Sequence, residues 1–62
     1  MKKWEVLFEI YRDISTKARM NYSVVVEAGT KKLAVLRAIE ALNKLEEYAN
    51  DYKSVKEVKE VM

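Results

Sequence analysis

The sequence predicts an α+β domain in which a three-stranded antiparallel sheet, of strand order 2-1-3, carries one long helix on one face (ββαβ). Three observations predict this fold. Two segments near the N-terminus alternate apolar and polar residues with the period of a strand, an Ala- and Leu-rich segment follows with helical period, and a short Val-rich tail ends the chain. With 62 residues, the chain has room for a single domain, residues 1–62.

The first strand is predicted from Lys2 to Ile14. Alternation places one set of side chains on the core face, namely Trp4, Val6, Phe8 and Ile10, and the other set on the opposite face, namely Glu5, Leu7, Glu9 and Tyr11. The polar segment Asp13–Ala18 lacks the Asn-Gly or Asp-Gly of a tight hairpin and therefore predicts a longer connection. A second strand is expected over Arg19–Ala28, with its core face formed by Tyr22, Val24 and Val26.

A long helix is predicted next, from Lys31 to Asp51, with Thr30 as its N-cap. Apolar residues recur at helical spacing, namely Val35, Ala38, Leu42, Leu45, Ala49 and Tyr52, and Leu36 and Ile39 widen the stripe. A stripe of this width suits packing on a sheet. We therefore expect Trp4 and Phe8 to pack against the helix through Leu36, Ile39 and Leu42.

The tail, Ser54–Met62, is compatible with two structures. Val residues three apart, and a Ser54/Glu57 capping box, favour a helix and hence a ββαα fold. The richness in Val, and the free edge that the first strand offers, favour a third strand. A helix that returns across a hairpin delivers the chain to the end from which a strand would run antiparallel to the first. The ββαβ fold is therefore preferred, with ββαα as the alternative.

Composition excludes most catalytic chemistry. The chain has no Cys, no His, no Pro and one Gly, so thiolate and imidazole metal sites and Cys or His nucleophiles are excluded. Ten acidic residues remain, without a cleft in which a carboxylate pair could act. We expect a non-enzymatic protein with no catalytic residue, no metal and no cofactor. No apolar run approaches the ~18 residues that a membrane span needs, so a cytoplasmic protein without a membrane partner is expected.

Basic residues concentrate in the first part of the chain. Residues 1–37 hold eight basic and four acidic groups, whereas residues 38–62 hold four and six. Hairpin geometry brings Lys2, Lys3, Lys31 and Lys32 to one end of the sheet, beside a Gly-containing bend at a helix N-terminus, where anions are favoured. This arrangement supports an alternative function, RNA or DNA association through phosphate contacts of Lys2, Lys3, Lys31, Lys32 and Arg37.

The sheet face without a helix predicts an interaction surface. Leu7, Tyr11 and Val25 fall on this face, with Glu5 and Glu9 at their rim, and Leu7 and Val25 are expected opposite each other across the hairpin. Tyr11 is the one aromatic residue expected there. A domain this small rarely keeps more than about 3–5 kcal/mol of net stability, and a partner can cover apolar surface that the monomer cannot. We therefore expect these five residues to contact a second copy, as a homodimer, or a larger host protein.

Two resemblances extend these expectations. The succession W-E-V-L-F-E-I, Y-S-V-V-V-E-A-G-T, an Ala/Leu helix and V-K-E-V-K-E-V resembles the small ββαβ accessory proteins of phages and archaeal viruses. This resemblance implies a virus-encoded modulator or inhibitor of a host enzyme. The same layout is similar to the archaeal large-subunit ribosomal protein LX, which implies a role on RNA. The leading expectation is a protein-binding modulator that acts through its sheet face or edge.

Overall fold

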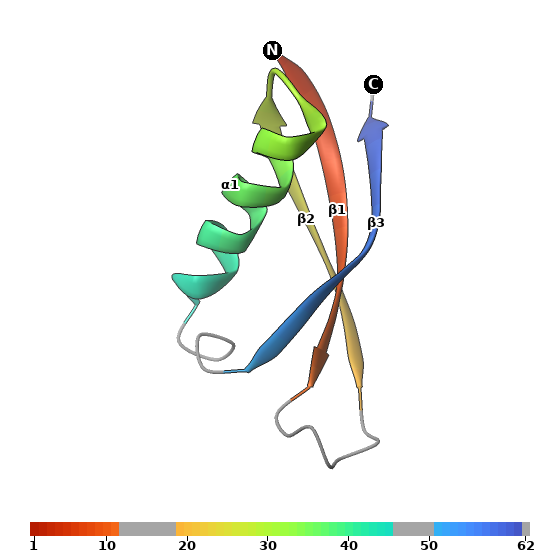
Figure 1. Ribbon diagram of the computed structural model, residues 1–62, viewed down its shortest axis with the longest axis vertical. Coiled ribbons are helices and arrows are strands. Elements are labelled where there is room, and N and C mark those ends of the chain that lie inside the picture. The colour runs from red at the N-terminus through yellow and green to blue at the C-terminus, as the bar shows by residue number, and fades with distance from the viewer. Residues whose placement is uncertain (12–18, 46–50, 62) are drawn as a thin grey trace.

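Three strands and one helix follow each other as the sequence predicts. The computed structural model describes residues 1–11, 19–45 and 51–61. The elements are β1 (Lys2–Tyr11), β2 (Met20–Ala28), α1 (Lys31–Asn43) and β3 (Tyr52–Val61). Both chain termini lie at the same end of the sheet (Figure 1). The predicted turn at Asp13–Ala18 lies outside the described residues.

The strands form one antiparallel sheet of order β2-β1-β3, which confirms the predicted topology. β1 is the central strand, and its Val6 pairs with Val24 of β2 and with Val58 of β3. The tail pairs with β1 from Lys3 to Tyr11, so the ββαα alternative is wrong. One register shift interrupts the β1–β3 ladder, because Leu7 pairs with Glu57 while Phe8 pairs with Val55. Lys56 is therefore the extra residue of a β-bulge.

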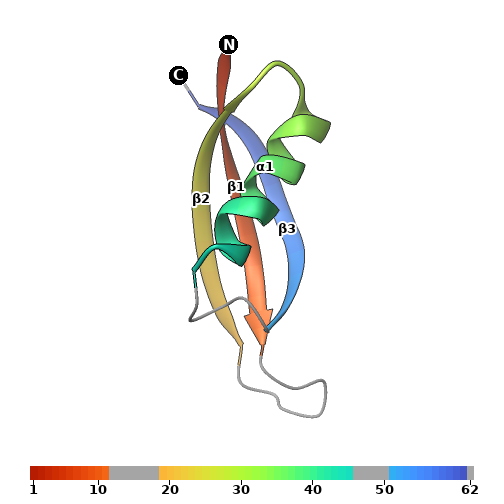
Figure 2. The ribbon, with the colours of Figure 1, turned by 90° about the vertical axis from the view of Figure 1, so that its left-hand side faces the viewer.

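α1 lies over one face of the sheet (Figure 2), and a small apolar core lies between the two. Its buried residues are Val6, Phe8, Ile10, Ala28, Ala34, Ala38 and Leu42. The alternation predicted for β1 and β2 is confirmed, because Trp4, Tyr22, Val24 and Val26 pack against these residues. The Trp4 Nε1–H group donates a hydrogen bond to the Ala28 carbonyl oxygen (3.0 Å), so the indole is both packed and satisfied.

The helix is shorter than the sequence predicts. It begins after the N-cap Thr30, whose Oγ1 accepts a hydrogen bond from the Leu33 N–H (3.2 Å), but it ends at Asn43 and not at Asp51. Apolar residues continue at helical spacing beyond this point, yet Tyr52 pairs with Tyr11 in the sheet and cannot lie in the helix. Because β3 begins at Tyr52, it also starts two residues before the predicted Ser54. Ala49 lies outside the described residues.

Leu36 does not belong to the core. It is 51% exposed, whereas Ile39 packs against the core and Leu42 is fully buried. Leu36 precedes the buried Ala38 by two residues, which corresponds to about 200° around a helix, so its side chain points away from the sheet. The expected contact of Trp4 and Phe8 with Leu36 was therefore wrong. The apolar stripe is narrower than the sequence predicted.

Candidate interaction surface

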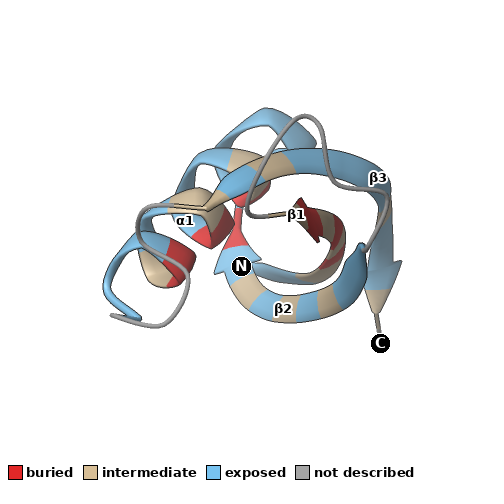
Figure 3. Ribbon diagram, turned by 90° about the horizontal axis from the view of Figure 1, so that it is seen from below, coloured by how far each residue is buried: buried red, intermediate tan, exposed pale blue. Residues whose placement is uncertain are grey.

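The face of the sheet turned away from α1, here called the open face, is the predicted interaction surface. Seen end-on, α1 lies on one side of the strongly curved sheet, and β2 and β3 present exposed and half-buried residues (Figure 3). Of the predicted contact residues, Leu7 and Tyr11 are half-buried and Val25 is 58% exposed. No described helix or strand covers this face.

The expected pairing of Leu7 with Val25 was wrong. Leu7 pairs with Ser23, and Val25 pairs with Glu5, so the two apolar side chains are diagonal neighbours on the same face. Register in a hairpin depends on the length and type of its turn, and the sequence between the first two strands has no Asn-Gly or Asp-Gly signal for either. The apolar part of the open face therefore runs obliquely across the strands.

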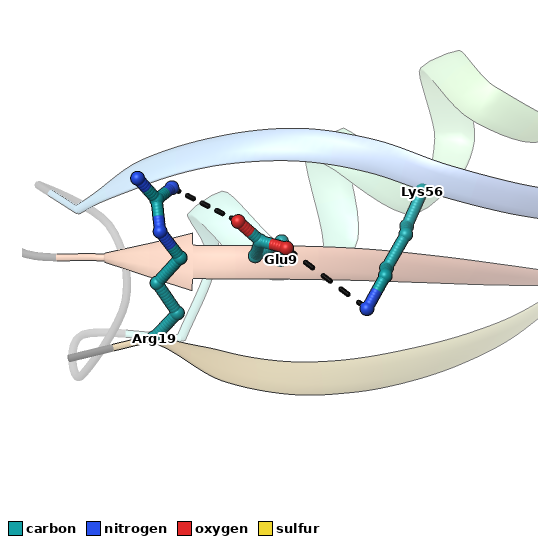
Figure 4. A network of polar contacts seen from close by, with 3 residues as sticks. All are labelled: Glu9, Arg19 and Lys56. Carbon is teal, nitrogen blue, oxygen red and sulfur yellow. Dashed lines mark hydrogen bonds and ion pairs between the residues drawn. The ribbon is translucent and has the colours of Figure 1, made fainter. Parts of the chain in front are cut away.

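Ion pairs between neighbouring strands surround these apolar residues. Glu9 on β1 pairs with Arg19 (2.9 Å), beside the start of β2, and with Lys56 of β3 (4.0 Å) (Figure 4). Glu5 pairs in the same way with Lys59 of β3 (3.3 Å). The predicted rim residues Glu5 and Glu9 are thus both on the open face, and each forms an ion pair with at least one Lys or Arg side chain. Exposed pairs of this kind contribute little to stability, but they hold the charges in place.

An aromatic pair lies on the open face where β1 ends and β3 begins. The rings of Tyr11 and Tyr52 are stacked, with centroids 5.6 Å apart and planes 18° from parallel. The Arg19 guanidinium carbon lies 4.5 Å from the Tyr11 ring centroid, a cation–π distance. Sequence reasoning missed Tyr52 because its spacing from Ala49 and Leu45 continued the helical stripe. The structure adds it to the predicted surface, where it is 48% exposed.

The outer edge of β2 adjoins the open face. β2 is an edge strand, and beside it lies a hollow of about 290 Å³ toward the C-terminal half of α1. The hollow is lined by Tyr22, Ser23, Val24, Val25, Ala41, Leu42 and Leu45. Its lining is therefore mostly apolar, and Val25 belongs to both the edge and the open face.

The basic residues predicted for nucleic-acid contact gather at the end of the sheet opposite the aromatic pair. Lys2 pairs with Ala28, the last residue of β2. Two residues separate Ala28 from α1, which begins with Lys31 and Lys32. Lys2 and Lys3 are consecutive in a strand, so their side chains point to opposite faces. The five residues Lys2, Lys3, Lys31, Lys32 and Arg37 therefore share one end of the molecule but do not form one flat patch.

Two of these basic side chains contact the domain itself. Lys2 lies 3.7 Å from the Glu60 carboxylate. Arg37 Nη1 donates a hydrogen bond to the Glu27 carbonyl oxygen (2.6 Å) and lies 3.7 Å from the Met1 sulfur. Arg37 thereby ties α1 to the end of β2, which gives it a structural role.

The described residues contain no group of three or more His, Cys, Asp or Glu side chains placed to hold a metal ion. No helix among them is long and apolar enough to cross a bilayer. Comparison with known proteins gives no match to any family model, to any curated protein or to any solved structure.

Proposed function

We propose that this chain is a small non-enzymatic protein that binds a larger protein through its open face and modulates it by occluding the surface it covers. The observation that carries the proposal is the open face itself. It leaves Val25 and Tyr52 exposed beside the half-buried Leu7 and Tyr11, and no described element covers them. Aromatic and aliphatic side chains within a polar rim are the usual centre of a protein–protein interface.

The charges of the open face suggest the chemistry of the partner. The acids at its rim, Glu5 and Glu9, are matched by bases from β3 and from Arg19. A face with paired charges offers no strong field of one sign to a highly charged ligand. It fits a protein surface that is close to neutral, with an apolar centre. The preformed ion pairs also lower the ordering cost of binding, because these side chains are already held.

A capture experiment with matched baits tests the proposal. The immobilised protein is exposed to an extract of its own cells, or of the host if the gene is viral, with and without nuclease. Leu7→Lys places a charge at the centre of the open face, whereas Leu36→Lys makes the same change on the outer side of α1. We expect a protein retained by wild type and Leu36→Lys, lost with Leu7→Lys, and unaffected by nuclease. Circular dichroism establishes that both variants are folded.

Equal capture by the two variants would contradict binding through the open face. Loss of all captured protein on nuclease treatment would instead support the second candidate, RNA or DNA association. The register supports that candidate in one respect, since it brings Lys2 to the same end of the sheet as Lys31 and Lys32. Against it, Lys2 forms an ion pair with Glu60, and Arg37 donates a hydrogen bond to a backbone carbonyl. Tyr11 is already stacked on Tyr52 and in contact with the Arg19 guanidinium. A base would have to displace these contacts to stack on Tyr11.

A further inference from the structure

The two edge strands of the sheet differ sharply in charge. β3 carries five charged residues in ten, namely Lys53, Lys56, Glu57, Lys59 and Glu60, and a bulge at Lys56 interrupts its ladder. β2 carries one charged residue in nine, Glu27, and pairs with β1 without a register shift. Charges and bulges are the devices that keep edge strands from pairing with other chains. β3 has both, and the stretch Ser23–Val26 of β2 has neither.

We propose that the β2 edge pairs with the β2 edge of a second copy, antiparallel and about a two-fold axis, so that one sheet continues through both molecules. This inference goes beyond the proposed function, because it concerns the edge of the sheet and leaves Leu7, Tyr11 and Tyr52 on the open face for another protein. A two-fold axis normal to the sheet keeps both helices on one side and both open faces on the other. Self-association would thus double the area of the proposed binding surface.

The side chains of β2 select the register. With the axis at Val25, this residue faces its own copy, Val24 faces Val26, and Ser23 faces Glu27 of the second copy. Val25 is the most exposed apolar residue of the strand, at 58%, so this register removes the most exposed apolar side chain of β2 from water. The Ser23 hydroxyl can donate to the carboxylate opposite it. An axis at Glu27 would set two carboxylates against each other, which is unfavourable in a cross-strand pair.

The hollow beside β2 fits the same arrangement. It is lined by Val24 and Val25 of this edge strand and by Ala41 and Leu42 of α1. In the proposed register, Val26 of the second copy comes to the rim of this hollow, on the helix side of the sheet. A second copy therefore brings an apolar side chain to an apolar depression. A highly charged partner strand would not offer this complementarity.

A charge introduced at Val25, the residue on the proposed two-fold axis, tests the register. Val25→Lys and Val25→Glu each place two like charges opposite each other in the proposed dimer, and the fold should persist because Val25 is exposed in the single chain. We expect wild type to show a monomer–dimer equilibrium with a dissociation constant on the order of 10 µM by sedimentation equilibrium. Each variant alone should raise that constant at least about tenfold. An equimolar mixture of the two variants should restore dimers, because opposite charges then face each other.

The control is the same pair of changes at Val55 on the other edge strand. Val55 is 41% exposed but pairs with Phe8 on the helix side of the sheet, so circular dichroism first establishes that both control variants are folded. Val55→Lys and Val55→Glu should leave the equilibrium of the wild type unchanged. A wild type that remains monomeric to millimolar concentration would overturn the proposal, and so would loss of dimers in the Val55 variants or failure of the mixed Val25 variants to associate. None of these results bears on capture of a larger protein by the open face, which the Leu7→Lys bait tests separately.

Discussion

Phe8 is the side chain whose loss should matter most to stability. It is 1% exposed, lies on the central strand, and pairs with Tyr22 on one side and Val55 on the other. A buried phenylalanine removes roughly 150 Å² or more from water, which at roughly 25 cal/mol per Å² amounts to about 4 kcal/mol. Truncation of a buried phenylalanine to alanine typically lowers the free energy of unfolding by about 3–5 kcal/mol. Because a domain of this size rarely has more than about 3–5 kcal/mol of net stability, the Phe8→Ala variant should be largely unfolded.

Urea denaturation followed by far-ultraviolet circular dichroism and by Trp4 fluorescence measures this loss. Phe8→Leu keeps most of the volume and should cost under about 1.5 kcal/mol, so a folded reference exists at the same position. Leu36→Ala is the matched control, since this leucine is exposed and its truncation should cost less than about 1 kcal/mol. A Phe8→Ala protein that unfolds cooperatively within about 1 kcal/mol of the wild type would refute the assignment of the core.

Two further predictions concern the third strand and the basic end. Deletion from Lys56 onward removes the residues of β3 that pair with Lys3–Leu7 and should strongly destabilise the domain; thermal melts that match the wild type would contradict the pairing of β3 with β1. If the chain binds RNA or DNA, its affinity should fall steeply with added salt, and Lys31→Glu combined with Lys32→Glu should abolish binding to a fluorescent oligonucleotide. The absence of any anisotropy change at low salt would exclude that function, because the electrostatic attraction is strongest there.

The strands were predictable because their alternation is unambiguous. Val6, Phe8 and Ile10 are buried, while the residues between them, Leu7 and Glu9, lie on the other face, as a period of two requires. The third strand was predictable for a different reason. Its local spacing allowed a helix, but the first strand offered a free edge where the returning chain arrives. Pairing along this edge satisfies the backbone groups with which the two strands face each other.

The end of the helix and the hairpin register were not predictable from local pattern. Leu45 and Tyr52 continue a helical spacing, yet the sheet requires Tyr52 opposite Tyr11, and this long-range pairing decides where the helical turns must stop. The error had a consequence for the candidate site, because it removed Tyr52 from the open face. Likewise, the pairing of Leu7 with Ser23 depends on the connection between β1 and β2, whose sequence has no turn signature.

The thinness of the core explains why association is expected of this domain. Among the described residues seven are buried apolar residues, and three of these are alanines, namely Ala28, Ala34 and Ala38. The alanines bring α1 close to the sheet but bury little area each. α1 packs chiefly on β2, and none of the described helices and strands covers the other face of the sheet. Apolar groups such as Val25 therefore stay in water in the isolated chain, where they contribute nothing to folding. A second copy at the β2 edge and a larger protein on the open face would each bury part of this surface, and each would stabilise the folded state by mass action. If the dimer at the β2 edge forms, the melting temperature of the wild type should rise with protein concentration, and in Val25→Lys this rise should be much weaker over the same concentration range.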